Sequence, residues 1–168
     1  MDITLFSARS LWTMFHGIVL SGGALMGPAA APHGIPERQS RSLAILLAVT
    51  ALMLWLAVAV GTYVVFPAYR ATPPAGDVSF ANYPRAMLLA NPGTAWLHSF
   101  AMECKEHMPW IAAMLTTPAA FVSVRYRATM LSDASLRSMT TALVAIAFVL
   151  VAFIGLLGIF VNKAAPLQ

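Results

Sequence analysis

The sequence predicts an all-α integral membrane protein in which residues 1–168 form a single transmembrane domain, folded as a four-helix up-and-down bundle. Composition is the first indication, because 60% of the residues are hydrophobic and only 10% are charged, with a mean hydropathy of +0.77. A soluble domain carries about a quarter charged residues. The second indication is a set of four apolar segments near the roughly 20 residues that a membrane-spanning helix requires. We therefore expect the lipid bilayer to surround most of the chain.

Two of the four segments are apolar throughout and predict ordinary spanning helices over 43–66 and 140–162. Neither segment contains a charged residue. Pro67 follows the first segment and Lys163 follows the second, and both residue types are typical of the end of a membrane helix.

The first apolar segment, 8–27, contains His16 and several small residues, including Gly17 and Gly23. Small residues in a membrane helix indicate a close approach of another helix or of a flat cofactor. Arg9 is the only basic residue before the apolar run, and no small-residue cleavage pattern follows, so we expect this helix to be retained in the mature chain.

The third segment, 95–124, is interrupted by a charged stretch with Glu103, Lys105, Glu106 and His107. One interpretation is a single long helix whose first turns lie outside the lipid. The other is a surface helix over 96–106 followed by a membrane helix that begins near His107, with Pro109 in its first turn. Both place the charged stretch at one membrane surface. The proline-rich loop 70–93 is expected outside the membrane.

An up-and-down order brings the starts of the first and third helices to the same membrane side as the ends of the second and fourth. The polar residues collected there are Arg9, Trp12, His16, Tyr63, Tyr69, Arg70, Glu103, Glu106, His107, Trp110, Asn162 and Lys163. Ionisable residues at membrane depth cost a few kcal/mol each and so usually serve a function. We expect the functional site at this end.

The first hypothesis for this site is one haem b, with His16 and His107 as the two axial ligands of the metal. Two neutral imidazoles on facing helices hold a low-spin haem in a bundle, and Gly17 and Gly23 would leave room for the macrocycle. His98 precedes His107 by nine residues, which places it on the opposite side of the helix, and it is not expected to share the site.

Three further residues complete the predicted cofactor-binding set. Arg9 or Arg70 would meet the haem propionates at the membrane surface, and Trp110 lies on the same helical stripe as His107. In helix number and histidine depth the chain resembles the small haem-carrying membrane anchors of respiratory complexes and other four-helix cytochromes b. That resemblance implies a membrane subunit of an electron-transfer complex.

A second hypothesis keeps the electron-transfer setting but makes the site a quinol site. Glu103, Glu106 and Tyr63 would hydrogen-bond the quinone ring and handle its protons near the membrane surface, while apolar helices hold the tail. The haem and the quinol could also be bound together.

Other functions remain open. Met102, Cys104, His107 and Met108 are soft ligands that suit copper, although they point in different directions around one helix. The chain could instead be a non-catalytic accessory subunit that packs against larger membrane-protein subunits. No pattern predicts a catalytic residue, so we expect a subunit of an oxidoreductase complex rather than an enzyme alone. Nucleic-acid binding is not expected, because the basic residues are scattered singly.

The loops at the opposite end carry most of the remaining basic residues: Arg38, Arg41, Arg125, Arg127 and Arg137. Short loops rich in arginine are typical of the cytoplasmic side. We therefore expect a bacterial inner membrane protein whose termini and polar site face the periplasm.

Overall fold

The computed structural model describes residues 12, 15–17, 37–76 and 79–165, in which every regular element is a helix. The all-α prediction is confirmed for this part of the chain. Of the predicted first span, 8–27, only Trp12 and residues 15–17 are described. The four-helix membrane bundle as a whole therefore stays a prediction.

The first long helix is a continuous run of α3 (Glu37–Val60), η3 (Gly61–Val65) and α4 (Phe66–Arg70). It continues past Pro67, where the sequence predicted its end. A proline lacks the N–H that would bond to the carbonyl four residues earlier, and its ring clashes with that carbonyl. The π-helical turns of η3, immediately before the proline, widen the helix at this point and let it continue.

The second long helix follows a short helix, α5 (Pro84–Ala90), which lies within the proline-rich loop. It consists of α6 (Pro92–Trp96), η4 (Leu97–Met102) and α7 (Glu103–Arg125) without an interruption. The side chain of Asn91 caps its start by accepting a 2.8 Å hydrogen bond from the Gly93 N–H. The chain thus forms one long helix here rather than a surface helix and a separate membrane helix. Pro109 lies inside α7 and not at its first turn.

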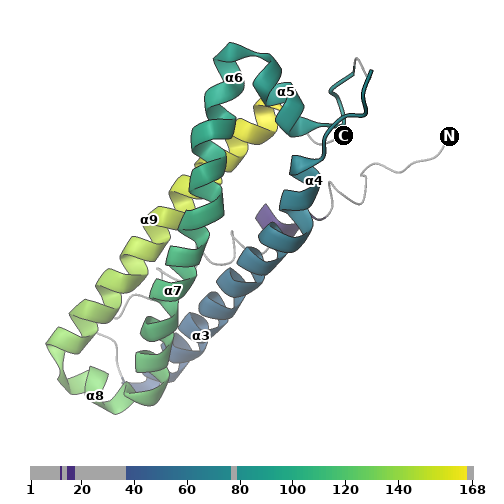
Figure 1. Cartoon of the computed structure of the whole chain (residues 1–168). Coiled ribbons are helices and arrows are strands. Elements are labelled where there is room, and N and C mark those ends of the chain that lie inside the picture. Colours follow the sequence, from purple (N-terminus) through teal and green to yellow (C-terminus); the bar gives the residue numbers. More distant parts are fainter. Residues whose placement is uncertain (1–11, 13–14, 18–36, 77–78, 166–168) are drawn as a thin grey trace.

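A short helix, α8 (Arg127–Ser132), turns the chain into the last long helix, α9 (Ala134–Ala164). Asp133 caps α9, because its carboxylate accepts hydrogen bonds from the Ser135 and Leu136 N–H groups at 2.9 and 3.0 Å. The three long helices run alternately up and down, and α7 lies between α3 and α9 (Figure 1).

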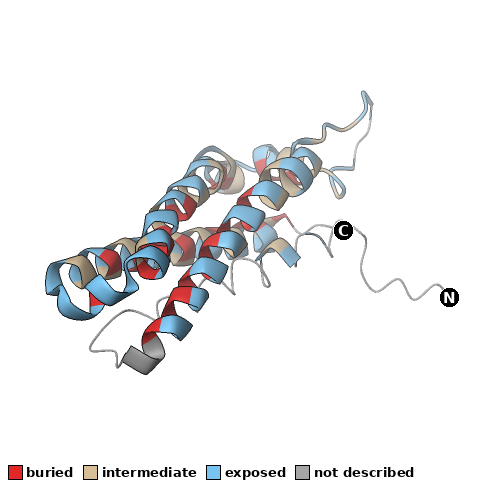
Figure 2. Ribbon diagram, turned by 90° about the horizontal axis from the view of Figure 1, so that it is seen from below, coloured by how far each residue is buried: buried red, intermediate tan, exposed pale blue. Residues whose placement is uncertain are grey.

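The central position of α7 depends on its small side chains. Its buried residues are Ala112, Ala113, Thr116, Ala119, Ala120 and Ser123. These alanines contact Leu43, Leu47, Leu54 and Val58 of α3 on one side and Val144, Ala147 and Val151 of α9 on the other. The buried residues form stripes along the faces where the helices meet (Figure 2). Small residues at such spacing let helix backbones come close in a membrane, where packing rather than water drives association.

The outward faces of the same helices carry large apolar residues. Those with more than half of their surface exposed include Ile45, Leu52, Met114, Phe121, Val124, Ile146, Val149, Leu156 and Ile159. A soluble monomer rarely exposes apolar residues so extensively. On α7 the large apolar side chains therefore lie outside and the small ones inside.

Two helical stretches among the described residues, Ser40–Arg70 and Ala134–Ala164, are long and apolar enough to cross a membrane. The core helix of a soluble protein would be mostly buried, but only 44% and 28% of their most apolar windows are buried within the molecule. The charged stretch at its start makes α7 less apolar. The predicted span 95–124 is therefore not among the candidate membrane helices of the described residues.

Enlarging one small residue in this interface should destabilise the fold. We expect Ala113→Leu, at a fully buried position, to lower the free energy of unfolding by about 1–3 kcal/mol, because the added methyl groups force α3 and α9 apart. Thermal unfolding in detergent, followed by circular dichroism, measures the change. Ala145→Leu at an exposed position of α9 is the matched control; equal stability of the two variants would contradict the packing described here.

Candidate functional site at one end of the bundle

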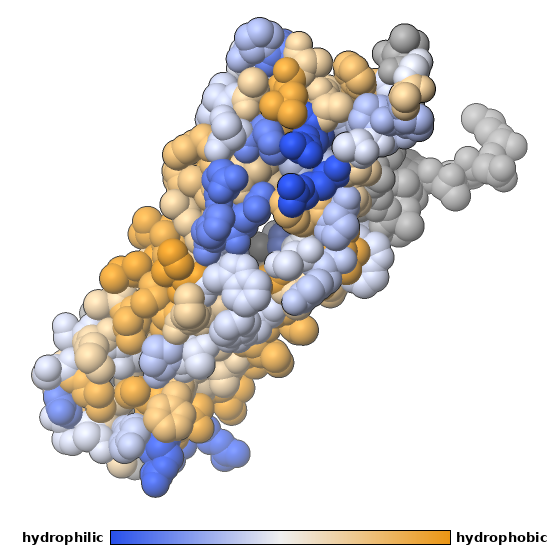
Figure 3. All heavy atoms as spheres, in the orientation of Figure 1, coloured by the Kyte–Doolittle hydropathy of each residue, from blue (hydrophilic) through white to orange (hydrophobic). Residues whose placement is uncertain are grey.

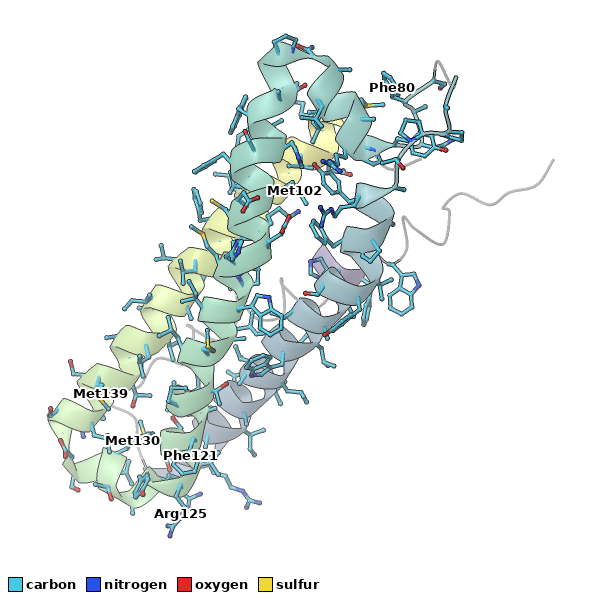
Figure 4. All side chains as sticks on the ribbon, in the orientation of Figure 1. Phe80, Met102, Phe121, Arg125, Met130 and Met139 are labelled. Atoms are coloured by element: carbon cyan, nitrogen blue, oxygen red, sulfur yellow. The ribbon has the colours of Figure 1, made fainter. Side chains whose placement is uncertain are left out.

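The end of α4, the helices α5 and η4, and the end of α9 converge on one cluster of buried residues. The cluster contains Tyr69, Leu88, Leu97, Ala101, Met102, Leu157, Val161 and Ala165. Figure 3 shows hydrophilic residues gathered in this half of the molecule, around a hollow between α7 and α4. Side chains of the two helices point toward one another just below Met102 in Figure 4. The polar site therefore lies where the bundle ends, beside an apolar cluster.

The centre of this site is a hydrogen bond between Tyr69 and His98. The Tyr69 hydroxyl lies 2.8 Å from Nδ1 of His98, and Tyr69 is only 5% exposed. The Tyr69 ring also stacks on Phe66 at a centroid distance of 6.2 Å. A buried phenol needs a polar partner, and His98 supplies it. Because the bond joins α4 to η4, it fixes the end of the first long helix against the second.

Two charged residues of opposite sign act on Tyr69. Arg85 comes from α5 and Glu106 from α7, and both side chains are half-buried. The Nε atom of Arg85 is buried and has no hydrogen-bond partner within the described residues. A buried donor without an acceptor costs free energy, so such an atom indicates a position that a ligand or water can satisfy. The site thus combines a phenol, an imidazole, a guanidinium and a carboxylate.

A second polar pair, His16 and Lys105, lies beside two glycines. A Cβ atom at Gly61 would be 2.8 Å from Cε1 of His16, and a Cβ atom at Gly158 would be 3.2 Å from Nζ of Lys105. Any larger residue at Gly61 would collide with the imidazole. Lys105 is close enough to act electrostatically on His16. Gly61 and Gly158 therefore make room for the two polar side chains within the bundle.

The two predicted haem ligands have different neighbours. His16 lies against Gly61 and near Lys105, whereas the His107 side chain is 72% exposed. Nδ1 of His107 is 2.9 Å from the main-chain oxygen of Glu103 and 3.8 Å from its carboxylate, so the ring is held on its own helix. At Gly17, which was predicted to make room for a macrocycle, a Cβ atom would meet no other atom within 4 Å.

The other predicted site residues lie mostly on the outer surface. Tyr63 is 75% exposed, and the Glu103 side chain is 66% exposed. Arg70 is exposed and lies over the Phe66 ring, 5.3 Å from its centroid. Trp110 packs edge to face on Trp55 of α3, at 5.9 Å between centroids. Of the predicted proton-handling residues, Glu106 alone belongs to the site around Tyr69.

Arg9 and Gly23 lie outside the described residues, so the structure places neither of them. Within the described part, no three His, Cys, Asp or Glu side chains gather as a metal-binding group. At mid-bundle, Thr50 and Thr116 line a space of about 10 Å³, the size of one water molecule. The haem b and copper predictions stay predictions.

The sequence interpretation missed three residues of this end: His98, Arg85 and Lys105. Helical geometry contained the signal for His98, because at about 100° per residue it lies opposite His107. With His107 on the outer surface, His98 faces inward. Arg85 offered no such signal, because it stands in a loop whose helix, α5, has no periodic apolar pattern. Only the folded chain brings it to Tyr69.

In comparisons with known proteins, no family model, no curated protein and no solved structure matches this chain. The functional argument therefore rests on the site itself.

A larger residue at Gly61 should displace His16 from its position. We expect Gly61→Leu to increase the rate at which diethyl pyrocarbonate modifies His16 severalfold, as measured by peptide mass spectrometry, because the imidazole can no longer lie against η3. Gly155→Leu is the control, since a Cβ there meets no atom within 4 Å. Unchanged reactivity in Gly61→Leu would show that His16 does not occupy this place.

Proposed function

We propose that this protein is a membrane-embedded subunit of an electron-transfer complex that binds the headgroup of a quinol or quinone at the Tyr69–His98 pair. The observation that carries the proposal is the partly buried 2.8 Å hydrogen bond between these two residues, together with the buried and unpartnered Nε of Arg85. The site differs from the one predicted from sequence: Tyr69, Arg85 and His98 take the place of Tyr63 and Glu103, and Glu106 belongs to both.

Membrane embedding is supported by the distribution of apolar residues. The outer faces of α3, α7 and α9 carry large exposed side chains, while the buried face of α7 consists of small residues. Lipid tails would cover the outer faces without a free-energy penalty. The polar site then lies at the level where the apolar helices end, which is where a quinone headgroup lies when its tail is in the bilayer.

The four polar groups suit both redox forms of a quinone. A quinone offers two carbonyl oxygens, which accept hydrogen bonds from donors such as Nε of Arg85. When the Tyr69 hydroxyl donates to Nδ1 of His98, Nε2 of that ring carries the proton and can donate to a carbonyl as well. A quinol instead donates its hydroxyl protons, and the Glu106 carboxylate is the acceptor present. The apolar cluster that contains Tyr69, Leu97 and Leu157 adjoins these polar groups.

This proposal is separate from the haem prediction. A haem held by His16 and His107 would require the exposed His107 ring to leave its contact with Glu103 and turn inward. The quinol proposal requires no such change at its central pair, because Tyr69 and His98 are already hydrogen-bonded. A visible spectrum of the purified protein distinguishes the two, since a bis-histidine haem has sharp absorption bands in the reduced form.

Removing the Tyr69 hydroxyl should weaken quinone binding. We expect Tyr69→Phe to raise the Kd for decylubiquinone about fivefold, since a hydrogen bond that orients the site contributes about 1 kcal/mol. Isothermal titration of the protein in detergent measures the Kd. Tyr63→Phe is the matched control, because that tyrosine is 75% exposed and outside the site; it should leave the Kd unchanged.

Substitutions of His98 and His107 provide a second, independent test of the quinol site. His98→Gln should weaken binding of the same quinone by about tenfold, because the imidazole contacts both Tyr69 and the ligand, whereas His107→Gln should have no effect. If the wild-type protein does not bind decylubiquinone, or if His98→Gln binds it as well as His107→Gln does, the quinol proposal is wrong. Circular dichroism of each variant verifies that the helical fold is retained.

A further inference from the structure

A group of exposed arginines lies at the end of the bundle opposite the polar site. Arg41 belongs to α3, Arg125 ends α7, and Arg127 begins α8; all three side chains are exposed. We call these three residues the arginine surface. In Figure 4, Arg125 lies at the tip of the bundle, beyond Phe121. Three different elements thus contribute guanidinium groups to one end of the molecule.

Helix packing places Arg41 and Arg125 at similar positions along the long axis of the bundle. Leu43 of α3 belongs to the same cluster as Ala120 of α7. Arg41 precedes Leu43 by two residues, about 3 Å along the axis, and Arg125 follows Ala120 by five residues, about 7.5 Å. Because α3 and α7 are antiparallel, both arginines lie beyond the Leu43–Ala120 cluster toward the same end of the bundle, within about two helical turns of it. Because α8 packs against α3 and α7, Arg127 belongs to the same end.

The other ionic residues that the structure describes in this turn are already engaged. Arg137 donates hydrogen bonds to the main-chain oxygens of Met130 and Leu131, at 2.8 and 2.9 Å, and so closes the end of α8. The Asp133 carboxylate accepts from two N–H groups at the start of α9. Both residues are thus bound to the main chain, whereas the three side chains of the arginine surface are exposed. Only Arg125 has a described ring contact, with Tyr126 at 5.6 Å.

The position of these arginines relative to the apolar surface identifies their surroundings. Arg125 directly follows Val124, which is 59% exposed, and Phe121 one turn earlier is also 59% exposed. Tyr126 is 46% exposed, as is typical of an aromatic residue at the boundary between lipid and water. The charges therefore begin within one turn of the lipid-facing surface, which is the depth of phospholipid headgroups.

We propose that the arginine surface binds the phosphate groups of anionic phospholipids. Guanidinium groups bind phosphate oxygens through paired hydrogen bonds, and each basic residue at an anionic membrane surface strengthens binding by a factor of roughly five. This proposal depends on the membrane embedding proposed above but not on the quinol site. It assigns the arginine end to the leaflet that is rich in anionic lipid and places the Tyr69–His98 site at the opposite surface.

Native mass spectrometry of the full chain tests the proposal. The purified protein in a neutral detergent is mixed with equal amounts of phosphatidylglycerol and phosphatidylcholine that carry the same acyl chains, and the ratio of bound lipids is measured. We expect the wild-type chain to prefer phosphatidylglycerol, and the double variant R125Q/R127Q to lose about tenfold or more of this preference. Adding R41Q should reduce it further.

The matched control removes two exposed cations from the other end of the molecule, in R70Q/K163Q. We expect this variant to keep the wild-type preference, which separates a local binding surface from the effect of net charge. If the wild-type chain shows no preference, if R125Q/R127Q retains it, or if R70Q/K163Q loses it equally, the proposal is wrong. Quinone titration of R125Q/R127Q should give the wild-type Kd. The lipid proposal and the quinol proposal can therefore fail separately.

Discussion

The arrangement of this protein depends on the close packing of α7 between α3 and α9. The buried face of α7 consists only of alanine, threonine and serine. Larger side chains on that face would hold the three backbones apart. Its two buried hydroxyl groups are satisfied within the helix, as the Thr116 and Ser123 side chains donate to carbonyls in the preceding turn. The central helix therefore carries polar atoms without needing partners from its neighbours.

This packing also determines where a polar site can form. Mid-bundle, the space lined by Thr50 and Thr116 has about the volume of one water molecule. Towards the Tyr69 end, η3 and η4 introduce π-helical turns in the first and the second of the three long helices. Such turns rotate the following residues and are frequent at functional sites. His98 lies within one of them, and Gly61, against which His16 packs, begins the other.

The two ends of the bundle differ in how their charges are used. At the Tyr69 end, Arg85 and Glu106 are half-buried and act electrostatically on a buried phenol. At the other end, three arginines face outward, while Arg137 and Asp133 complete the ends of helices. An inward arrangement suits a small polar ligand, and an outward arrangement suits a charged surface.

The sequence by itself determined the helical class and the four apolar segments, because an apolar run near 20 residues has the length of a helix that crosses the bilayer. It also indicated the end at which the polar residues gather. It could not determine which of them meet. Helical position alone does not show whether His98 or His107 faces inward, since that depends on how α7 is rotated against its neighbours. The nearness of Lys105 to His16 and the hydrogen bond between Tyr69 and His98 bring together residues from different helices. Only the tertiary structure decided these contacts, because they arise from the packing of whole helices rather than from any local pattern.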